Sequence, residues 1–370
     1  MVLQRRHQSM TDMDKIQQIR PKQFEQQLHY KIKANEQLQA QGYRKKPQMV
    51  WGPPGVGKSE IMYQQLTAAG YKVYEMRANL YDPIDVRGGI KIIELDNGTY
   101  RTVYGTPEDL PPSDTTEKVA LLIDELPQAT RATMNAFLQV TLDGAIGQYT
   151  LPIHTQILAG GNRAEDRTGA NEMPTALKNR FDHYSLMPSA EDCIHYLRNK
   201  GVAEDVCSFL RFKPNLCHQI DHTQYAFPTP RTWENIGHGL PLMMKEIKDM
   251  TPAEADGFMH YAIASKIGDG PAGEFIAFCK DAKQMPDLDD LIADPKGTPV
   301  PNSMSVVYST VGALINETTD KTIKSIGKWI RKLETEMQVV YFKDLCQKDK
   351  DYREHEVVEK WIDKNAGILN

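Results

Sequence analysis

The chain has 370 residues, with 44 lysines and arginines against 49 aspartates and glutamates, which gives a formal net charge of -5. Hydrophobic residues make up 40% of the chain and charged residues 25%, an ordinary globular composition. These values exclude a mostly disordered chain, a fibrous repeat and a disulfide miniprotein. Without a basic excess, a surface that binds nucleic acid throughout is disfavoured, although a local basic patch is compatible with the composition.

The cysteines and the apolar runs indicate in which cellular compartment the protein is expected. The five cysteines are scattered and no two form a CxxC pair, which favours a reducing environment. The first fifteen residues are polar and contain no apolar core, so they predict no secretory signal. Apolar runs such as 119–123 are too short to cross a bilayer. We therefore expect a cytoplasmic protein with no membrane partner.

The first two segments differ in pattern. Residues 1–46 are rich in Gln, Lys and Arg, and a patchy helical spacing of apolar residues predicts a solvated N-terminal lead-in helix. Residues 47–188 alternate short apolar runs with helical stretches, which predicts an α/β fold with a parallel sheet covered on both faces. The expected strands are 48–51, 71–76, 119–123, 155–159 and 183–187, and the expected helices include 58–69 and 130–142.

Two segments interrupt this alternation. Residues 89–104 place Asp96-Asn97-Gly98 between two runs of β-forming residues, which is a strong hairpin signal. Residues 143–154 predict a second, smaller hairpin before the fourth strand. From 189 onward the chain is predicted to be helical, with a proline-rich linker at 283–303 and two to four amphipathic helices at 304–370.

The clearest motif is GPPGVGKS at 52–59, which fits the pattern GxxxxGK[ST] between an apolar run and a predicted helix. Glycines let the backbone curl so that its N–H groups point at phosphate oxygens, and the helix N-terminus adds positive potential. Lys58 can reach the β- and γ-phosphates of a nucleotide, while the Ser59 hydroxyl can bind Mg²⁺. The predicted nucleotide-binding residues are Gly52, Pro53, Pro54, Gly55, Val56, Gly57, Lys58, Ser59 and Glu60.

The second motif is VALLIDE at 119–125, an apolar strand that ends in two acids. Asp124 can hold Mg²⁺ through the metal's water shell or through Ser59, so Ser59 and Asp124 are the expected metal ligands. Glu125 follows one residue later, where its carboxylate can polarise an attacking water. A buried strand that ends in acids is common and is weak evidence by itself. Here it indicates a magnesium site because a phosphate loop precedes it in the sequence.

With these two motifs and five further stretches in the same order, residues 45–240 resemble the AAA+ ATPases, and specifically their MoxR-like, dynein-related branch. Asp82–Gly88 resembles the segment before the branch's inserted hairpin, which would be 89–104. The other matching stretches are Leu151-Pro152 after Asp143-Gly144 (the hairpin before sensor 1), Gly160-Gly161-Asn162 (sensor 1), Asn179-Arg180-Phe181 (the arginine finger) and Thr229-Pro230-Arg231-Thr232-Trp233 (sensor 2).

The resemblance implies an α/β P-loop core at 47–188 with a five-stranded parallel sheet of order 5-1-4-3-2. It implies an α-helical lid at 189–283, followed by a linker and a helical segment at 284–370. ATP and Mg²⁺ are the implied substrate and cofactor. Because the finger of this family points into a neighbouring subunit's site, the resemblance also implies a homo-oligomeric ring, with a hexamer preferred.

The implied catalytic residues are Glu125, Asn162, Arg180 and Arg231. Asn162 can donate from its amide to the γ-phosphate and accept from the water, which aligns an in-line attack. Arg180 offers a rigid fork of donors for charge that develops on the γ-phosphate. Arg231 would lie in the first turn of a lid helix capped by Thr229, within reach of the phosphates.

Three functions are compatible with these motifs. The first is a ring-forming ATPase that remodels or assembles a protein complex, working on a protein client with a partner that carries a von Willebrand A domain. The second is a nucleic-acid motor or loader, which the net charge of -5 weakly disfavours. The third is a nucleotide-controlled interaction module with little hydrolysis, and the presence of Glu125 counts against it.

Other residues have two interpretations each. Arg163 and Arg167 are candidates for extra phosphate sensors or for the subunit interface, or they pair with Glu165 and Asp166. Tyr149 either faces a ring pore or packs within its hairpin. Cys217-His218 with His222 could grip a metal if they lay on a helix, but no further ligands are nearby and a plain surface is preferred.

Overall fold

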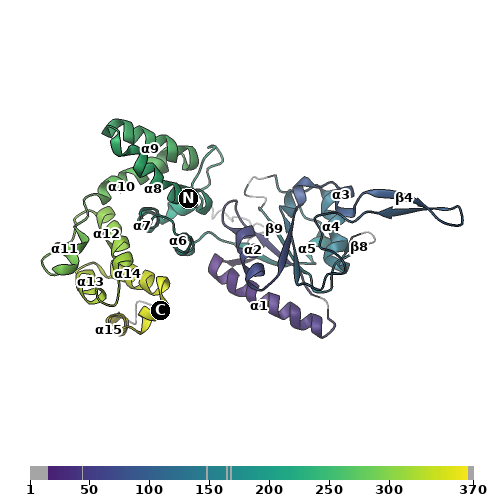
Figure 1. Ribbon diagram of the computed structural model, residues 1–370, viewed down its shortest axis with the longest axis horizontal. Helices are drawn as coiled ribbons and strands as arrows, with labels where there is room; N and C mark the ends of the chain where they lie inside the picture. The colour runs from purple at the N-terminus through teal and green to yellow at the C-terminus, as the bar shows by residue number, and fades with distance from the viewer. Residues whose placement is uncertain (1–15, 44, 147–148, 164–165, 167–168, 366–370) are drawn as a thin grey trace, which may run out of the picture. The chain divides into compact units, whose positions relative to one another are not determined.

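The computed structural model describes residues 16–43, 45–146, 149–163, 166 and 169–365 (Figure 1). Contacts along the chain divide it into two compact units, residues 1–188 and residues 189–370. The expected N-terminal lead-in therefore belongs to the same unit as the α/β core. The expected helical lid and the C-terminal segment together form the second unit. Within the described residues, no helix combines the length and the apolar character needed to cross a bilayer.

The first unit is built on a six-stranded parallel sheet. Its strands, from one edge to the other, are β1 (Gln17–Ile19), β10 (Asp182–Leu186), β2 (Gln48–Trp51), β9 (Gln156–Gly161), β6 (Val119–Asp124) and β3 (Lys72–Arg77). The last five of these are the strands expected from the sequence, and numbered along the chain they stand in the order 5-1-4-3-2.

The expectation of a five-stranded sheet was wrong, because the sheet has a sixth strand, β1, at one edge. β1 pairs with β10 in parallel, with Gln17 beside Tyr184 and Ile19 beside Leu186. Its three residues are Gln, Gln and Ile, and only Ile19 is buried. Three residues with one apolar side chain carry no periodic pattern, so this strand exists because of its partner rather than because of its own sequence.

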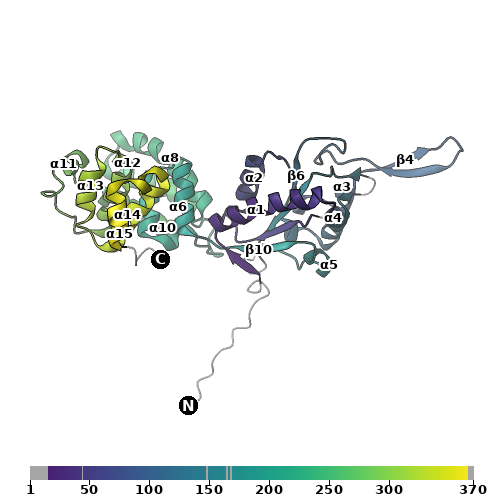
Figure 2. The same cartoon turned by 90° about the horizontal axis from the view of Figure 1, so that it is seen from below.

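The N-terminal helix α1 (Pro21–Ala40) is packed against the sheet, so the expectation of a solvated lead-in was wrong. Phe24, Leu28 and Ile32 are 0%, 0% and 2% exposed and belong to one hydrophobic cluster with residues of α2 (Lys58–Ala68) and the sheet. α1 and α2 lie side by side on this face (Figure 2). The apolar stripe is narrow, which explains why its polar background concealed it.

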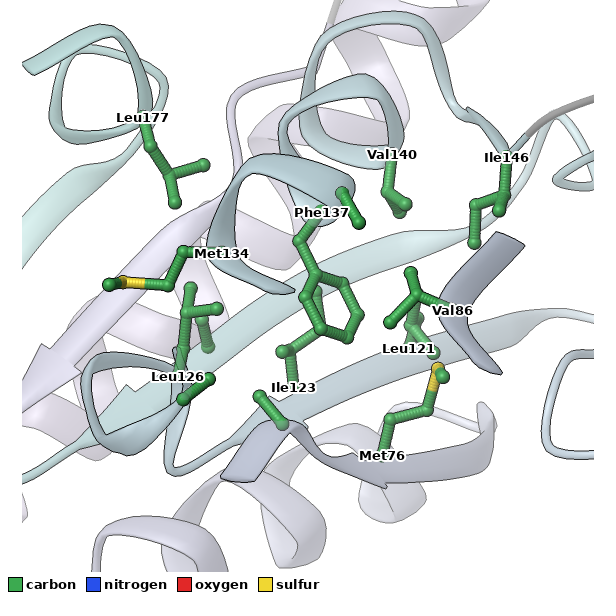
Figure 3. Close-up of a cluster of buried hydrophobic side chains, with 14 of the residues drawn as sticks. Met76, Val86, Leu121, Ile123, Leu126, Met134, Phe137, Val140, Ile146 and Leu177 are labelled. Atoms are coloured by element: carbon green, nitrogen blue, oxygen red, sulfur yellow. The ribbon is translucent and has the colours of Figure 1, made fainter. Parts of the chain in front are cut away.

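The opposite face of the sheet is covered by α4 (Arg131–Asp143), with α3 (Pro83–Arg87) and α5 (Thr175–Lys178) nearby. Figure 3 shows Phe137 of α4 pointing toward Ile123 of β6, with Met134 and Val140 on either side of it. Helices on both faces bury β6 completely from Val119 to Ile123. This burial fixes where the strand ends and therefore where its acidic residues emerge.

Both expected hairpins are present. β4 (Ile90–Glu94) and β5 (Tyr100–Tyr104) pair in antiparallel fashion and extend away from the sheet of this unit (Figure 1). The base of the hairpin is pinched: a Cβ on Gly88, whose φ is +90°, would lie 1.6 Å from the Gly105 carbonyl oxygen. The smaller hairpin pairs β7 (Ala145–Ile146) with β8 (Tyr149–Thr150).

The regular elements in the described part of the second unit are all helices. Its helices are α6 (Ala190–Asn199), α7 (Glu204–Phe212), α8 (Pro230–Glu246), α9 (Pro252–Ile267), α10 (Asp269–Ala282), α11 (Leu288–Ala293), α12 (Met304–Glu317), α13 (Ile323–Ile330), α14 (Thr335–Lys348) and α15 (Glu356–Asn365). The expected linker at 283–303 contains α11, which the sequence did not predict. Asp287 caps this helix by accepting from the backbone N–H groups of Asp289 and Asp290, 3.0 Å away.

One buried carboxylate on α14 connects this helix to α6 and α7. Asp344 on α14 has a side chain that is 0% exposed, and it accepts from Arg198 Nη1 of α6 at 2.6 Å and from Arg211 Nε of α7 at 3.0 Å. Arg198 also donates to Glu204 at 3.1 Å, so the two arginines face two carboxylates. Burial raises the pKa of Glu204. The C-terminal helices are thereby tied to α6 and α7 through charge as well as through apolar contact.

We predict that Asp344→Ala lowers the free energy of unfolding by about 3–5 kcal/mol, because it leaves two largely buried guanidinium groups without their shared partner. Urea unfolding followed by tryptophan fluorescence measures this, since Trp233, Trp329 and Trp361 all lie in the second unit. Asp363→Ala, at an exposed position on α15, is the matched control and should change stability by less than about 0.5 kcal/mol. Equal effects of the two substitutions would contradict the role of Asp344.

Candidate functional site

The loop at 52–57 connects the end of β2 to the start of α2, the position that a phosphate-binding loop requires. Gly57 is the residue just before α2 and has φ +98°, a backbone conformation that a side chain would strain. Gly52 donates its N–H to the Gly161 carbonyl at 3.3 Å, which anchors the start of the loop to β9. The first backbone N–H groups of α2 point out of the start of the helix, which makes this end favourable for an anion.

Lys58 closes the loop. Its ammonium donates to the carbonyls of Gly52 at 2.8 Å and Pro53 at 3.0 Å, and to Asn162 Oδ1 at 2.7 Å. The residue is only 8% exposed. Lys58 and Asn162 are far apart in the sequence, and they meet because β2 and β9 are neighbours whose carboxyl ends share one edge of the sheet.

Ser59 and Asp124 meet at the same edge. The Ser59 hydroxyl donates to Asp124 Oδ2 at 2.5 Å, and Asp124 Oδ1 accepts the N–H of Glu125 at 2.9 Å. A hydroxyl and a carboxylate are the hard oxygen donors that Mg²⁺ prefers, so this pair fits the ion together with phosphate oxygens and water. Across the described residues, no group of three or more His, Cys, Asp and Glu side chains could hold a metal by protein ligands alone.

Glu125 has a distinctive backbone. Its φ is +54°, and no other non-glycine residue in the described part of the chain has a positive φ. Such a conformation is costly and persists where the surrounding structure holds it in place. It turns the chain sharply at the end of β6, so that the short 3₁₀ helix η3 (Leu126–Gln128) crosses the end of β9.

The two glycines before Asn162 make room for this crossing. A Cβ on Gly160 would lie 2.8 Å from Asp124 Oδ1, and a Cβ on Gly161 would lie 2.2 Å from Cδ of Pro127. In the sequence, Gly160 and Gly161 are recognisable only as part of a motif. Their structural reason is that the carboxylate of β6 and the proline of η3 occupy the space of the missing side chains.

Gln128 is a member of this site that the sequence analysis missed. In the orientation that pairs both ends of its amide, Oε1 accepts from the backbone N–H of Asn162 at 3.0 Å and from Asn162 Nδ2 at 3.2 Å. Its amide nitrogen then donates to the Glu125 carbonyl at 3.2 Å. A glutamine three residues after Glu125 is not part of any motif recognised in the sequence. Its meaning comes from the turn at Glu125, which the sequence does not reveal.

Arg180 lies on the turn between α5 and β10 and is half-buried, and its Nε is buried without a hydrogen-bond partner. Among the described residues, no hydrogen bond joins it to Lys58 or Asn162. Its turn is fixed through His183, which accepts from Trp51 Nε1 at 3.0 Å and whose Nε2 lies 2.7 Å from the Lys178 carbonyl. Burial lowers the pKa of His183, which favours the neutral ring that this pair of contacts requires.

Arg231 belongs to the second unit, and its side chain is exposed on the first turn of α8. The predicted cap is present, because the Thr229 hydroxyl accepts from the Thr232 N–H at 3.2 Å. Trp233, which follows in the same turn, is fully buried and donates Nε1–H to the Leu216 carbonyl at 2.7 Å. The start of α8 is therefore a rigid base for Arg231.

The residues with two interpretations also have positions in the structure. Tyr149 is buried and donates to the Pro111 carbonyl, which matches the packed interpretation, and burial raises its pKa to about 12. Arg163 pairs with Asp166 at 3.1 Å, as the ion-pair interpretation expects. Arg167 lies outside the described residues. Cys217 ends a short 3₁₀ turn and His218 is extended, so these residues and His222 do not lie on one helix.

Comparisons with known proteins give no family. No family model matches the chain, and no curated protein matches it. Similar solved structures include the RuvB Holliday junction branch migration motor of Thermotoga maritima, with 13% identity over 82% of this chain and 87% of that one, at a TM-score of 0.40. NtrX of Brucella abortus has 15% identity over 80% of this chain and 64% of that one, at a TM-score of 0.35. At TM-scores this low, neither likeness decides fold or function.

We predict that Gly161→Ala disrupts the site, because the new Cβ would overlap Pro127 and push η3 away from β9. Overpacking of this kind costs about 1–3 kcal/mol of stability, measured by denaturant unfolding, and should also weaken nucleotide binding. Gly257→Ala is the matched control: it lies within α9 with nothing within 4 Å of the new Cβ, and it should be neutral or stabilising. Unchanged stability and nucleotide binding in Gly161→Ala would contradict the packing described.

Proposed function

We propose that the chain is a Mg²⁺-dependent AAA+ ATPase that hydrolyses ATP to ADP and phosphate. The observation that carries the proposal is the convergence of Lys58 and Asn162, 2.7 Å apart, with Ser59 and Asp124, 2.5 Å apart, at one edge of a parallel sheet. These residues come from three different parts of the sequence. They combine a phosphate-binding cation, two hard oxygen donors and an orienting amide, which is the set that phosphoryl transfer to water needs.

Binding of the triphosphate would use the loop and α2 together. The loop N–H groups and the start of α2 would receive the phosphate oxygens. Lys58 would exchange the carbonyls of Gly52 and Pro53 for the β- and γ-phosphates, which offer full negative charge. Ser59 and Asp124 would hold Mg²⁺, which neutralises charge on the phosphates when it is bound.

Hydrolysis would need a positioned water. Glu125, half-buried directly after Asp124, would polarise that water and take its proton at the carboxylate. Asn162 would donate one amide hydrogen to the γ-phosphate and accept from the water at Oδ1. In the part of the chain that the structure describes, no hydrogen bond joins Arg180 to Lys58 or Asn162, which fits the proposal that it stabilises the γ-phosphate charge in a neighbouring subunit of a ring.

For the biological role, we propose the remodelling or assembly of a protein complex, as in the MoxR-like branch, with a von Willebrand A domain partner. The hairpin β4–β5 supports a protein client. Ile90, Ile92 and Tyr100 on it are 56%, 68% and 70% exposed. Its two strands carry only two basic residues, Lys91 and Arg101, which are too few to form a basic stripe. A nucleic-acid motor would need such a stripe. Residues 189–283 would serve as the lid, and the five cysteines, none in a disulfide, suit a reducing cytoplasm.

We predict that Glu125→Gln binds ATP with near-normal affinity but hydrolyses it at least about 100-fold more slowly, because the amide cannot take a proton from the water. Binding is measured with a fluorescent ATP analogue, and turnover by phosphate release in the presence of Mg²⁺. Chelation of Mg²⁺ should abolish turnover in the wild type. Glu94→Gln, at an exposed acid of the hairpin, is the control. Near-normal turnover in Glu125→Gln would remove this residue from the mechanism.

A second prediction concerns Arg180. Arg180→Ala should bind ATP and lose about 10³-fold or more of its turnover. Lys58→Ala should lose tight binding while its own Arg180 stays intact, so a mixture of the two inactive variants should regain part of the activity.

The matched control for this mixture replaces Lys58→Ala with the double variant Lys58→Ala/Arg180→Ala, which supplies no intact Arg180 and should not rescue. A mixture that is no more active than its components would refute action of Arg180 across a subunit interface.

A further inference from the structure

The amide of Asn162 is held from both sides. Its Oδ1 accepts from Lys58 Nζ at 2.7 Å, and its Nδ2 lies 3.2 Å from Gln128 Oε1. The same Gln128 oxygen accepts the backbone N–H of Asn162 at 3.0 Å. An amide has its acceptor on one side and its donors on the other, so these contacts decide which end faces which partner.

Gln128 is itself fixed in place. Its backbone N–H donates to the Glu125 carbonyl at 3.0 Å, and its side-chain nitrogen donates to the same carbonyl at 3.2 Å. The preceding Pro127 has a restricted backbone, and its carbonyl accepts from the Asn171 N–H at 2.6 Å. The close fit of Pro127 over Gly161 leaves η3 little freedom to move.

The two contacts of Asn162 differ in what happens when a nucleotide arrives. Lys58 would leave Oδ1 for the phosphates, which are stronger acceptors because they are charged. The Gln128 oxygen faces the Asn162 donors rather than the phosphate-binding loop, so phosphates on the loop would not displace it as they would displace Lys58. After binding, Gln128 would be the contact that still fixes the Asn162 amide.

We infer that Gln128 is a positioning residue for hydrolysis. On the proposed ATPase function, it holds one hydrogen of Asn162 Nδ2 so that the other hydrogen points at the γ-phosphate and Oδ1 points at the water. Without Gln128, the amide can turn over and present its oxygen to the phosphate, which repels it. Because the side chain also bonds to the Glu125 carbonyl, it links the residue that polarises the water to the residue that orients it.

Three variants separate these contacts. Gln128→Met is close in size and makes neither hydrogen bond. Gln128→Glu keeps the acceptor that faces Asn162 and loses the donor that faces the Glu125 carbonyl. Gln37→Ala, at an exposed position of α1, is a control for loss of a glutamine. We expect Gln128→Met to lower kcat about 10-fold or more, with ATP affinity within about 3-fold of wild type. The kcat of Gln128→Glu should lie between those of Gln128→Met and the wild type.

The decisive measurement is a double-mutant cycle in kcat with Asn162→Ala. If Gln128 acts by positioning Asn162, Gln128→Met should cost little once Asn162 is already Ala. A full additional loss in the Asn162→Ala background would overturn the inference, because Gln128 would then act by another route. Thermal unfolding of each variant tests for a merely structural role, which would lower Tm and ATP affinity along with kcat.

The outcomes also separate this inference from the proposed function. A wild-type chain that hydrolyses ATP beside a Gln128→Met variant of equal kcat would overturn the inference alone. A wild-type chain that binds Mg²⁺-ATP and never hydrolyses it would overturn the proposed function, and the inference with it.

Discussion

The candidate site depends on how closely the ends of β6 and β9 approach each other. Side chains at Gly160 and Gly161 would overlap Asp124 and Pro127, so the approach exists only because both residues lack a Cβ. The approach brings the Asp124 carboxylate to Ser59 and carries η3 across to Asn162. The positive φ of Glu125 is part of the same constraint, since the chain must turn sharply to leave β6 over the end of its neighbour.

The parts that the sequence predicted are those in which short segments carry their own signal. The phosphate loop is contiguous, and β6 is a fully apolar run followed by acids, so the sequence alone indicates Lys58, Ser59 and Asp124. The meeting of Lys58 with Asn162 also follows once the strands are parallel, because the carboxyl ends of parallel strands share an edge. The sequence could not predict β1 or Gln128. A three-residue edge strand has no periodicity, and the role of Gln128 requires the left-handed turn at Glu125.

In the second unit, too, the sequence predicts the individual helices but not the residues through which they meet. Its individual helices were expected, but nothing local in Asp344, Arg198 or Arg211 indicates that they meet, because two of them lie more than a hundred residues from the third. The carboxylate is fully buried, so the charge is acceptable only because two guanidinium groups satisfy it. A segment whose sequence resembles a linker followed by a separate C-terminal region is in this way made part of one unit with α6 and α7.

Lys58 shows how binding and catalysis can be coupled within the first unit. Its ammonium donates to two loop carbonyls and to Asn162 Oδ1, so the buried charge is satisfied by three acceptors. The Asn162 oxygen in this contact is also the one that would accept from the water on the proposed function. On the proposed function, a phosphate that draws Lys58 away would leave Gln128 as the contact that keeps the Asn162 amide from turning. On the proposed function, the same lysine would thus connect the binding of the phosphates with the orientation of the Asn162 amide.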